Sequence, residues 1–321
     1  MRPSILLSFA FLAATASVFG AVDNNLLALV PPGVKIISSI DVEHARSSQF
    51  GQYLLSRINS EDQHFQKLNQ ETGFDPRRDL QDFVFASTGS SGEDGQPRFA
   101  ILARGTFDPN RIKAAAKANG ASVKTYQGVE MILDNSSQEK TGFAFPDIGV
   151  AVMADATTLR QIIANRANPT PLEPSVQTMV SKIGPDNDAW FVSLMSGSYL
   201  TNHLAEETKQ PIQQAQALQS ILQSSGGIRF GDTVQLSFDA ITRSPKDATS
   251  LADVVRFVAS MIQMQRQNDP RADILASSLD KMNLTTDTDA IHVSISLPEK
   301  SLEQLAEAGP LGSSAKHHHA Q

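Results

Sequence analysis

The residues best placed for nucleophilic chemistry are serines that precede a lysine by three positions. Ser137–Lys140 and Ser278–Lys281 have this S-x-x-K spacing, and Lys140–Gly142 has the sequence K-T-G. Enzymes of the penicillin-binding type need both motifs with two different lysines, whereas Lys140 would have to serve in both. Ser278 stands in a predicted helix without companion motifs, and the chain has no G-x-S-x-G sequence. We interpret both matches as chance and name no catalytic residue.

The spacing of aspartate, histidine and glycine residues does not predict a metal site or a phosphate-binding loop either. The D-x-D pairs Asp186/Asp188 and Asp287/Asp289 are too small a ligand set for calcium, which takes six or more oxygens. No H-E-x-x-H pair occurs, and four histidines are isolated: His44, His64, His203 and His292. The tail cluster His317–His319 lacks the fixed geometry of a zinc site. No G-K-[ST] loop follows Gly226–Gly227, which we interpret as a helix stop and turn. We therefore predict no metal site and no cofactor.

Two Phe-Asp-Pro stretches, TGFDPRRDL at 72–80 and GTFDPNRI at 105–112, share one capping chemistry. Asp108 can accept hydrogen bonds from unpaired helix amides, and Pro109 suits the first helical position. The same reasoning applies to Asp75 and the residue after it. An alternative is an anion site built from Arg77 and Arg78 with the turn amides, but the neighbouring aspartates would compete with any anion.

Composition excludes several classes of partner. The chain has no cysteine, so disulfides, thiol nucleophiles and thiolate metal sites are excluded. A formal charge of −7 without a basic face disfavours nucleic acid, whose phosphates need neutralising. A hydrophobic fraction of 40% is enough for a folded core in the roughly 300 residues of a mature chain.

The first residues have the layout of a secretory signal peptide. Arg2 supplies a positive charge, the segment 5–14 is apolar, and small residues follow. Cleavage fits after Gly20 or after Ala16, and the sequence does not choose between them. We predict an exported protein, periplasmic or secreted, with no stable membrane insertion after cleavage, because no later stretch has spanning length.

Period-two alternation predicts strands at 34–42, 234–240 and 291–297, which is typical of antiparallel sheets with one polar face. Helical spacing of apolar residues appears at 50–58, 159–163 and 251–262, and the glutamine-rich stretch 210–225 fits an amphipathic helix. We expect an α+β fold with mostly antiparallel sheets and helices packed on one face.

Three prolines in NPTPLEP, residues 168–174, mark the clearest break in the chain. Similar element order on both sides predicts two related modules: signal peptide 1–20, N-terminal module 21–167, connection 168–188, C-terminal module 189–307 and flexible tail 308–321. We expect Ile36, Ile40 and Ile101 in one core, and Leu236, Phe238, Val293 and Ile295 in another. Whether the halves are separate domains or one continuous sheet stays open.

Residues 27–200 resemble an uncharacterised family of exported bacterial proteins, known only as a domain of unknown function. The resemblance lies in VPPGVKIISSIDV, the TGFDPRRDL turn, RFAILARGTFDPNRIKAAAKA, TYQGVEMIL and IGVAVMADATTLRQII. It implies an exported α+β protein and transfers no activity or site residue.

The leading hypothesis is a non-enzymatic cell-envelope protein that binds an unidentified protein or envelope ligand. The alternative is a periplasmic hydrolase with unrecognised carboxylate or serine chemistry, and a third option is a structural role in an envelope complex. A pocket with converging titratable groups would favour the enzyme, and an exposed polar sheet face or apolar groove would favour binding.

Overall fold

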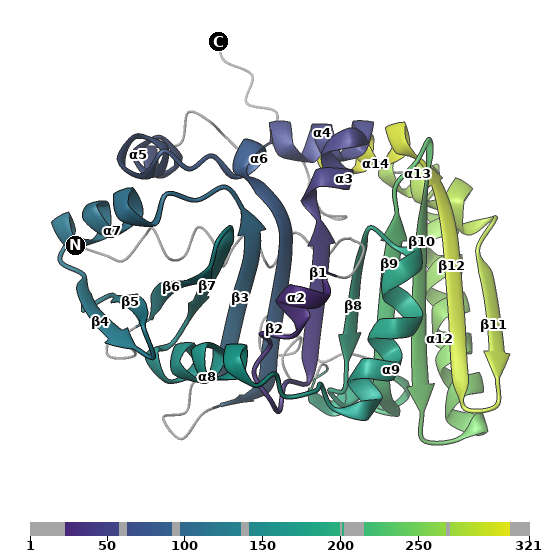
Figure 1. Cartoon of the computed structure of the whole chain (residues 1–321). Coiled ribbons are helices and arrows are strands. Elements are labelled where there is room, and N and C mark those ends of the chain that lie inside the picture. The colour runs from purple at the N-terminus through teal and green to yellow at the C-terminus, as the bar shows by residue number, and fades with distance from the viewer. Residues whose placement is uncertain are drawn as a thin grey trace, which may run out of the picture.

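A single antiparallel sheet forms the centre of the molecule. The computed structural model describes residues 23–57, 63–91, 97–135, 141–199, 201, 215–267 and 270–308. Within these ranges twelve strands lie in the order β11-β12-β10-β9-β8-β1-β2-β3-β7-β6-β5-β4 (Figure 1). The predicted α+β class with antiparallel pairing is confirmed.

The strands are β1 (Ile36–Asp41), β2 (Leu80–Ser91), β3 (Pro97–Gly105), β4 (Ser122–Tyr126), β5 (Val129–Leu133), β6 (Gly142–Asp147), β7 (Val150–Ala154), β8 (Ala189–Ser193), β9 (Ile221–Arg229), β10 (Thr233–Thr242), β11 (Asn283–Asp287) and β12 (Ala290–Pro298). The helices are α2 (Asn24–Leu27), α3 (Val42–Ser47), α4 (Gln49–Ser56), α5 (Gln63–Thr72), α6 (Pro76–Asp79), α7 (Pro109–Ala118), α8 (Ala156–Ala167), α9 (Pro174–Ile183), α11 (Ala215–Leu218), α12 (Pro245–Met264), α13 (Pro270–Leu279) and α14 (Glu299–Ala308), with a 3-10 turn at Gly184–Asp186.

The two halves of the chain meet at the central pair β1–β8. Strands β1 to β7 form the first half of the sheet and β8 to β12 the second. Outward from the centre, β2, β3, β7 and β6 in the first half match β9, β10, β12 and β11 in the second. The sheet is continuous across the proline-rich stretch, because β1 pairs with both β2 and β8. Separate modules are therefore not confirmed.

The principal helices pack on opposite faces in the two halves. We call the face that carries Ile37 and Val192 the front, and strand register places Ser225 and Asp239 on it too. Helices α2, α8 and α9 lie over the front, while α12 lies behind β10 and β12 (Figure 1). The back face of the second half carries Phe238 and the residues that pack beneath α12.

The largest core lies under α8 and α9 on the front of the first half. Leu159, Ile162 and Ile163 of α8 are buried against the sheet. Val176, Val180 and Ile183 of α9, together with Trp190 and Val192 of β8, join the same cluster. Residues 174–192 thus complete the core of the first half. The proline-rich stretch is a connection between two helices on one face, and Pro174 opens α9.

The expected core groupings are wrong in detail. In β1 the fully buried residues are Ile37 and Ser39, whereas Ile36 and Ile40 are only half-buried. Ile40 packs with Phe74 in a smaller cluster at the end of the sheet, which among the described residues includes neither Ile36 nor Ile101. Both faces of β1 carry apolar residues, so alternation alone could not choose the face that α9 covers.

The second expected grouping divides in the same way. Phe238 and Val293 pack beneath α12, while Leu236 packs with Phe230 and Leu302 against α4 and α14. Strands β10 and β12 are long enough to meet different helices at their two ends.

The predicted helix at 210–225 is confirmed only at Ala215–Leu218 and is wrong from Ile221 onward. Residues 210–214 lie outside the described chain, α11 covers only Ala215–Leu218, and β9 begins at Ile221. Ser224 and Ser225 pair with both β8 and β10, and Gln223 pairs with β10, so two ladders of backbone hydrogen bonds outweigh a weak helical preference.

Gly226 and Gly227 lie within β9 and do not form the predicted turn. A Cβ on Gly226 would stand 2.5 Å from Cε1 of Phe191, and one on Gly227 would stand 2.3 Å from the Asn187 side chain. These glycines let neighbouring side chains lie flat on the strand.

Both Phe-Asp-Pro stretches cap helices as predicted. The Asp108 carboxylate accepts a hydrogen bond from the Arg111 amide at 3.0 Å, and the Asp75 carboxylate accepts one from the Arg77 amide at 3.0 Å. The phenylalanines before the two caps stack on each other, with the Phe74 and Phe107 ring centroids 5.3 Å apart. The two helix starts that share this capping chemistry are thus also joined by a ring contact.

Candidate functional site

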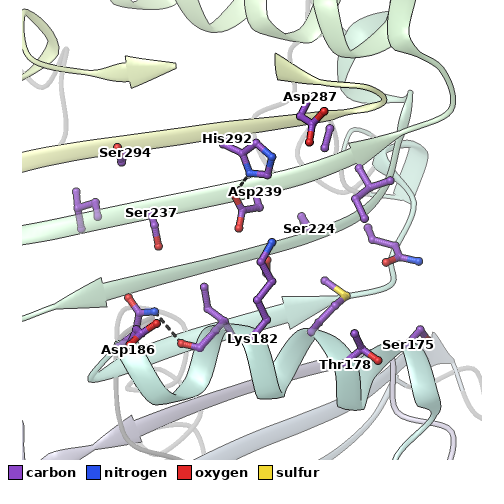
Figure 2. A pocket seen from close by; sticks show the side chains of 18 of the residues that line it. Ser175, Thr178, Lys182, Asp186, Ser224, Ser237, Asp239, Asp287, His292 and Ser294 are labelled. Atoms are coloured by element: carbon purple, nitrogen blue, oxygen red, sulfur yellow. Dashed lines mark hydrogen bonds and ion pairs between the residues drawn. The ribbon is translucent and has the colours of Figure 1, made fainter. Parts of the chain in front are cut away.

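A polar groove lies on the front of the second half, where no core forms. Helix α9 makes one wall, and strands β9, β10, β12 and the β11–β12 turn make the floor. The groove has a volume of about 1080 Å³ and is open to solvent (Figure 2). This exceeds the ~300–1,000 Å³ that is usual for small-molecule pockets.

The floor follows from alternation along the strands. In β10, Val234, Phe238 and Ala240 turn to the back, so Ser237 and Asp239 face the front. In β12 the same alternation places His292 and Ser294 on the front. Across the ladder Ser237 is paired with Ser294, and Asp239 with His292. Polar side chains therefore form adjacent rows on this floor.

Helix α9 forms the wall of the groove, and the apolar side of this helix holds it in place against the sheet. Val176, Val180 and Ile183 anchor α9 in the core. Thr178 and Lys182 lie roughly 150° around the helix from this buried side and line the groove, as a period of 3.6 residues requires. Lys182 extends from the helix into the groove (Figure 2). The groove is therefore bounded by a rigid element.

The centre of the floor holds a histidine–carboxylate pair. Nδ1 of His292 lies 2.6 Å from Oδ1 of Asp239. An aspartate on Nδ1 orients the ring and leaves Nε2 for a ligand. Ser237, two residues before Asp239 on β10, donates its hydroxyl to the Gly227 carbonyl at 3.3 Å. Among the described residues no serine hydroxyl bonds to the His292 ring, so the pair has no positioned nucleophile.

The charged groups of the groove are largely unpaired. In the part of the chain that the structure describes, neither Lys182 nor Arg229 forms an ion pair. Asp186, Asp287 and Asp289 line the groove without a cationic partner within the same described residues. Unpaired charges of both signs around an open groove are groups that a ligand can engage.

The residues of the two D-x-D pairs and His292, which the sequence analysis considered as metal ligands, do not all lie in the groove. Asp186, Asp287, Asp289 and His292 line it. Asp188 is buried outside it, where Oδ2 accepts from the Phe230 amide at 2.6 Å and Oδ1 contacts the His44 ring.

The serine–lysine matches gain no support. Ser278 is buried in α13, and its hydroxyl donates to the Ile274 carbonyl at 3.2 Å. Ser137–Lys140, His203 and His317–His319 lie outside the described residues, as does the side chain of His64. Among the described residues, no group of three or more metal-binding side chains occurs.

The alternative anion site at the TGFDPRRDL turn is opposed by its own ion pairs. The Arg77 guanidinium donates to both oxygens of Asp75 at 3.0 and 2.8 Å, and Arg78 donates to both oxygens of Asp79 at 2.7 Å. The hydrogen bonds from Arg77 lower the pKa of Asp75, and those from Arg78 lower the pKa of Asp79. Both guanidinium groups are thus engaged internally.

Sequence reasoning missed Lys182, Ser237 and Asp239, which belong to the groove. The alternation at 234–240 had placed Asp239 on a polar face, but the pairing of Asp239 with His292 depends on strand register. The one usable signal was that two predicted strands had polar faces with serine, aspartate and histidine on them.

A perturbed carboxyl group lies away from the groove, in the first half. Burial raises the pKa of Asp82 to about 6, and the carboxylate of Asp41, directly opposite on β1, adds to the effect. Arg104, the next residue across on β3, is already hydrogen-bonded to Asp23. Asp82 is not part of the groove, and its raised pKa makes the stability of the folded protein depend on pH.

A second exposed feature is apolar and lies on α12. Phe257, Val258, Met261 and Met264 are 50%, 41%, 38% and 73% exposed on one side of this helix. No helix among the described residues is long and apolar enough to cross a membrane.

The comparisons with known proteins show the fold and no function. No family model and no curated protein matches the chain. A solved crystal structure of a protein named TP0453 is similar, with a TM-score of 0.50 and 9% identity. The match covers 88% of this chain and 97% of that chain. At this identity the similarity concerns the whole-chain α+β fold alone.

Proposed function

We propose that the protein is exported to the cell envelope, as a periplasmic or secreted protein, and acts there by binding a ligand in the polar groove. The open groove with unpaired charged and hydroxyl side chains supports binding. The layout of residues 1–20 supports export, and cleavage after Ala16 or Gly20 would give two distinct masses for the mature protein.

The similar strand order in the two halves also supports an internal duplication. In this proposal one copy kept a covered front face, and the other changed that face into a binding surface. The resemblance to exported bacterial proteins of unknown function is consistent with the proposed location and adds no site.

The alternative function, a periplasmic hydrolase, has one observation in its favour, namely the Asp239–His292 pair in the groove. The absence of a positioned serine among the described residues weighs against it. Loss of a hydrolytic activity in His292→Gln, with unchanged ligand retention, would favour the hydrolase over the binding function.

Ligand retention tests the binding function directly. The mature protein is incubated with a soluble extract of its own cell envelope, repurified and measured by native mass spectrometry. Ser294→Trp places a large side chain in the groove, and Ser296→Trp is the matched control on the same strand and face, outside the groove. We expect retained mass in the wild type and in Ser296→Trp and none in Ser294→Trp. No retained mass in the wild type, or equal retention in all three, contradicts the proposal.

A further inference from the structure

We infer that the groove takes an extended peptide that places a lysine or arginine side chain at the β11–β12 end. This inference rests on the proposed binding function and names the chemistry of its ligand. Three features of the groove carry it: the shape, the pattern of hydrogen-bonding groups, and one end that joins an exposed apolar side chain to two carboxylates.

The shape favours a linear ligand. The floor extends along β10 from Gln235 to Ile241, which are six residues apart. At ~3.3 Å per residue this is roughly 20 Å, the length of about six extended residues. The wall is the ten-residue helix α9, which is roughly 15 Å long at 1.5 Å per residue.

The lining groups suit a peptide backbone. Ser225, Ser237, Ser294 and Thr178 carry hydroxyls, and Gln223 and Gln235 carry amides. The Ser225 and Ser294 hydroxyls and the two amides can donate and accept, whereas the Ser237 and Thr178 hydroxyls donate to the Gly227 and Pro174 carbonyls and are left to accept. Together these groups can pair with successive N–H and C=O groups of a peptide. Among the described residues, no Phe, Tyr or Trp lines the groove. The groove therefore offers no aromatic platform for a nucleobase, for which stacking is a main source of affinity.

The balance of charge disfavours an anionic ligand. Asp186, Asp239, Asp287 and Asp289 oppose Lys182 and Arg229, so carboxylates are in excess. Phosphate-rich ligands would meet repulsion at most positions. Lys182 and Arg229 lie away from the β11–β12 turn, and they suit a carboxylate or the backbone carbonyls of the same peptide.

One end fits a long basic side chain. Ile241 is 38% exposed and pairs across the ladder with Ala290, and the Thr242 amide donates to the Asp289 carbonyl at 2.8 Å. Asp287 ends the adjacent strand β11 (Figure 2). Lysine and arginine cover apolar surface with their methylene stems and keep the charge in a polar setting. Their stem would lie on Ile241, with the cation beside Asp287 and Asp289.

A synthetic library of hexapeptides tests the inference. The mature wild type is screened, and the best peptide is then measured by isothermal titration against each variant. We expect selection of lysine or arginine at one position, and binding at least tenfold weaker in the double variant Asp287→Asn and Asp289→Asn. Replacing the basic residue of the peptide by norleucine should have a similar effect on the wild type and little effect on the double variant.

The matched control variant also loses two carboxylates, but at positions outside the groove. Asp253→Asn with Asp273→Asn removes two exposed carboxylates on α12 and α13, outside the lining, and should leave peptide affinity unchanged. Recovered peptides without basic enrichment, or an unaltered affinity in the groove double variant, overturn the inference. Absence of peptide binding together with envelope-ligand retention overturns the peptide class and leaves the binding function intact, whereas absence of both overturns both.

Discussion

The front face of the sheet is a closed core in the first half and an open groove in the second. In the first half Val84, Leu102 and Val152 share one core cluster with Leu159 and Ile162 of α8, and both α8 residues are fully buried. In the second half the corresponding strands present Ser225, Ser237 and His292. The order of the first five strands outward from the centre is the same in both halves, so the difference lies in the side chains of this face and in the helices that cover it.

This comparison shows how α9 produces the groove. The helix buries its apolar side in the core of the first half and presents its polar side to the second. Helix α9 then has no second apolar side with which to cover the floor of β9, β10 and β12, and that polar floor does not require one. A polar face beside a rigid helix stays solvated until a ligand displaces the water.

The largest expected effect is a loss of stability when the closed face is damaged. Ile162→Ala deletes a fully buried side chain under α8. We expect it to lower the free energy of unfolding by about 2–5 kcal/mol, because the cavity adds to the lost burial. Urea denaturation of the mature protein measures it. A loss below about 1 kcal/mol would mean that the first-half front face is not a tightly packed core.

The second largest effect on stability is expected at Asp82, a half-buried carboxyl group at the margin of the closed face. The unperturbed pKa of Asp82 is 3.8 and the folded value is about 6, so between these values the folded state holds a proton that the unfolded state has lost. The free energy of unfolding therefore falls as pH rises from about 4 to 6. Asp82→Asn removes this fall and should stabilise the protein at pH 7 by about 1–2 kcal/mol, after a discount for partial exposure.

Unfolding in urea at pH 4, 5, 6 and 7 checks this prediction. The stabilisation by Asp82→Asn should be present at pH 7 and should shrink below pH 6. A pH-independent difference between wild type and Asp82→Asn would contradict a buried carboxyl group at this position.

A smaller loss of stability is expected when the Asp108 cap of α7, which lies outside the two compared faces, is removed. Asp108→Ala removes the bond to the Arg111 amide at the start of α7 and should cost about 1 kcal/mol, within the usual ~0.5–2 kcal/mol. Asn110→Ala, one residue beyond Pro109 and exposed, is the control and should be neutral. Equal stability of Asp108→Ala and the wild type would contradict the cap and the shared role of the two Phe-Asp-Pro stretches.

The smallest effect on stability is expected on the open face. Ser294 is exposed on the groove floor, so Ser294→Ala should change the free energy of unfolding by less than about 0.5 kcal/mol. The same urea experiment applies. A loss comparable with that of Ile162→Ala would show that the floor is part of a packed core, and the contrast between the two halves would fail.

The fold class and the two caps could be predicted because they depend on local rules. Strand alternation gave the antiparallel sheet, and the aspartate–proline pairs gave the starts of α6 and α7. The strand at Ile221–Arg229 could not be recognised, since its pairing with β8 and β10 involves residues far away in the chain. The stacking of Phe74 on Phe107 has the same long-range character.

The sequence predicted that two strands of the groove floor have a polar face, but it did not predict the groove itself. His292, Asp287 and Asp289 were considered as metal ligands and rejected, and nothing local indicated that Asp239 pairs with His292 or that Lys182 lies opposite them. That arrangement depends on the strand register and on how α9 is anchored by Val176 and Val180.

Hydrogen–deuterium exchange tests most directly whether the open face is the binding surface. Exchange of the mature protein is compared by mass spectrometry with and without the envelope extract. We predict slower exchange in residues 174–187, 223–229, 235–241 and 287–294, which line the groove, and unchanged exchange in β2, β3 and β7. Slower exchange confined to the apolar side of α12, at residues 257–264, or to the first half would contradict a binding site in the groove.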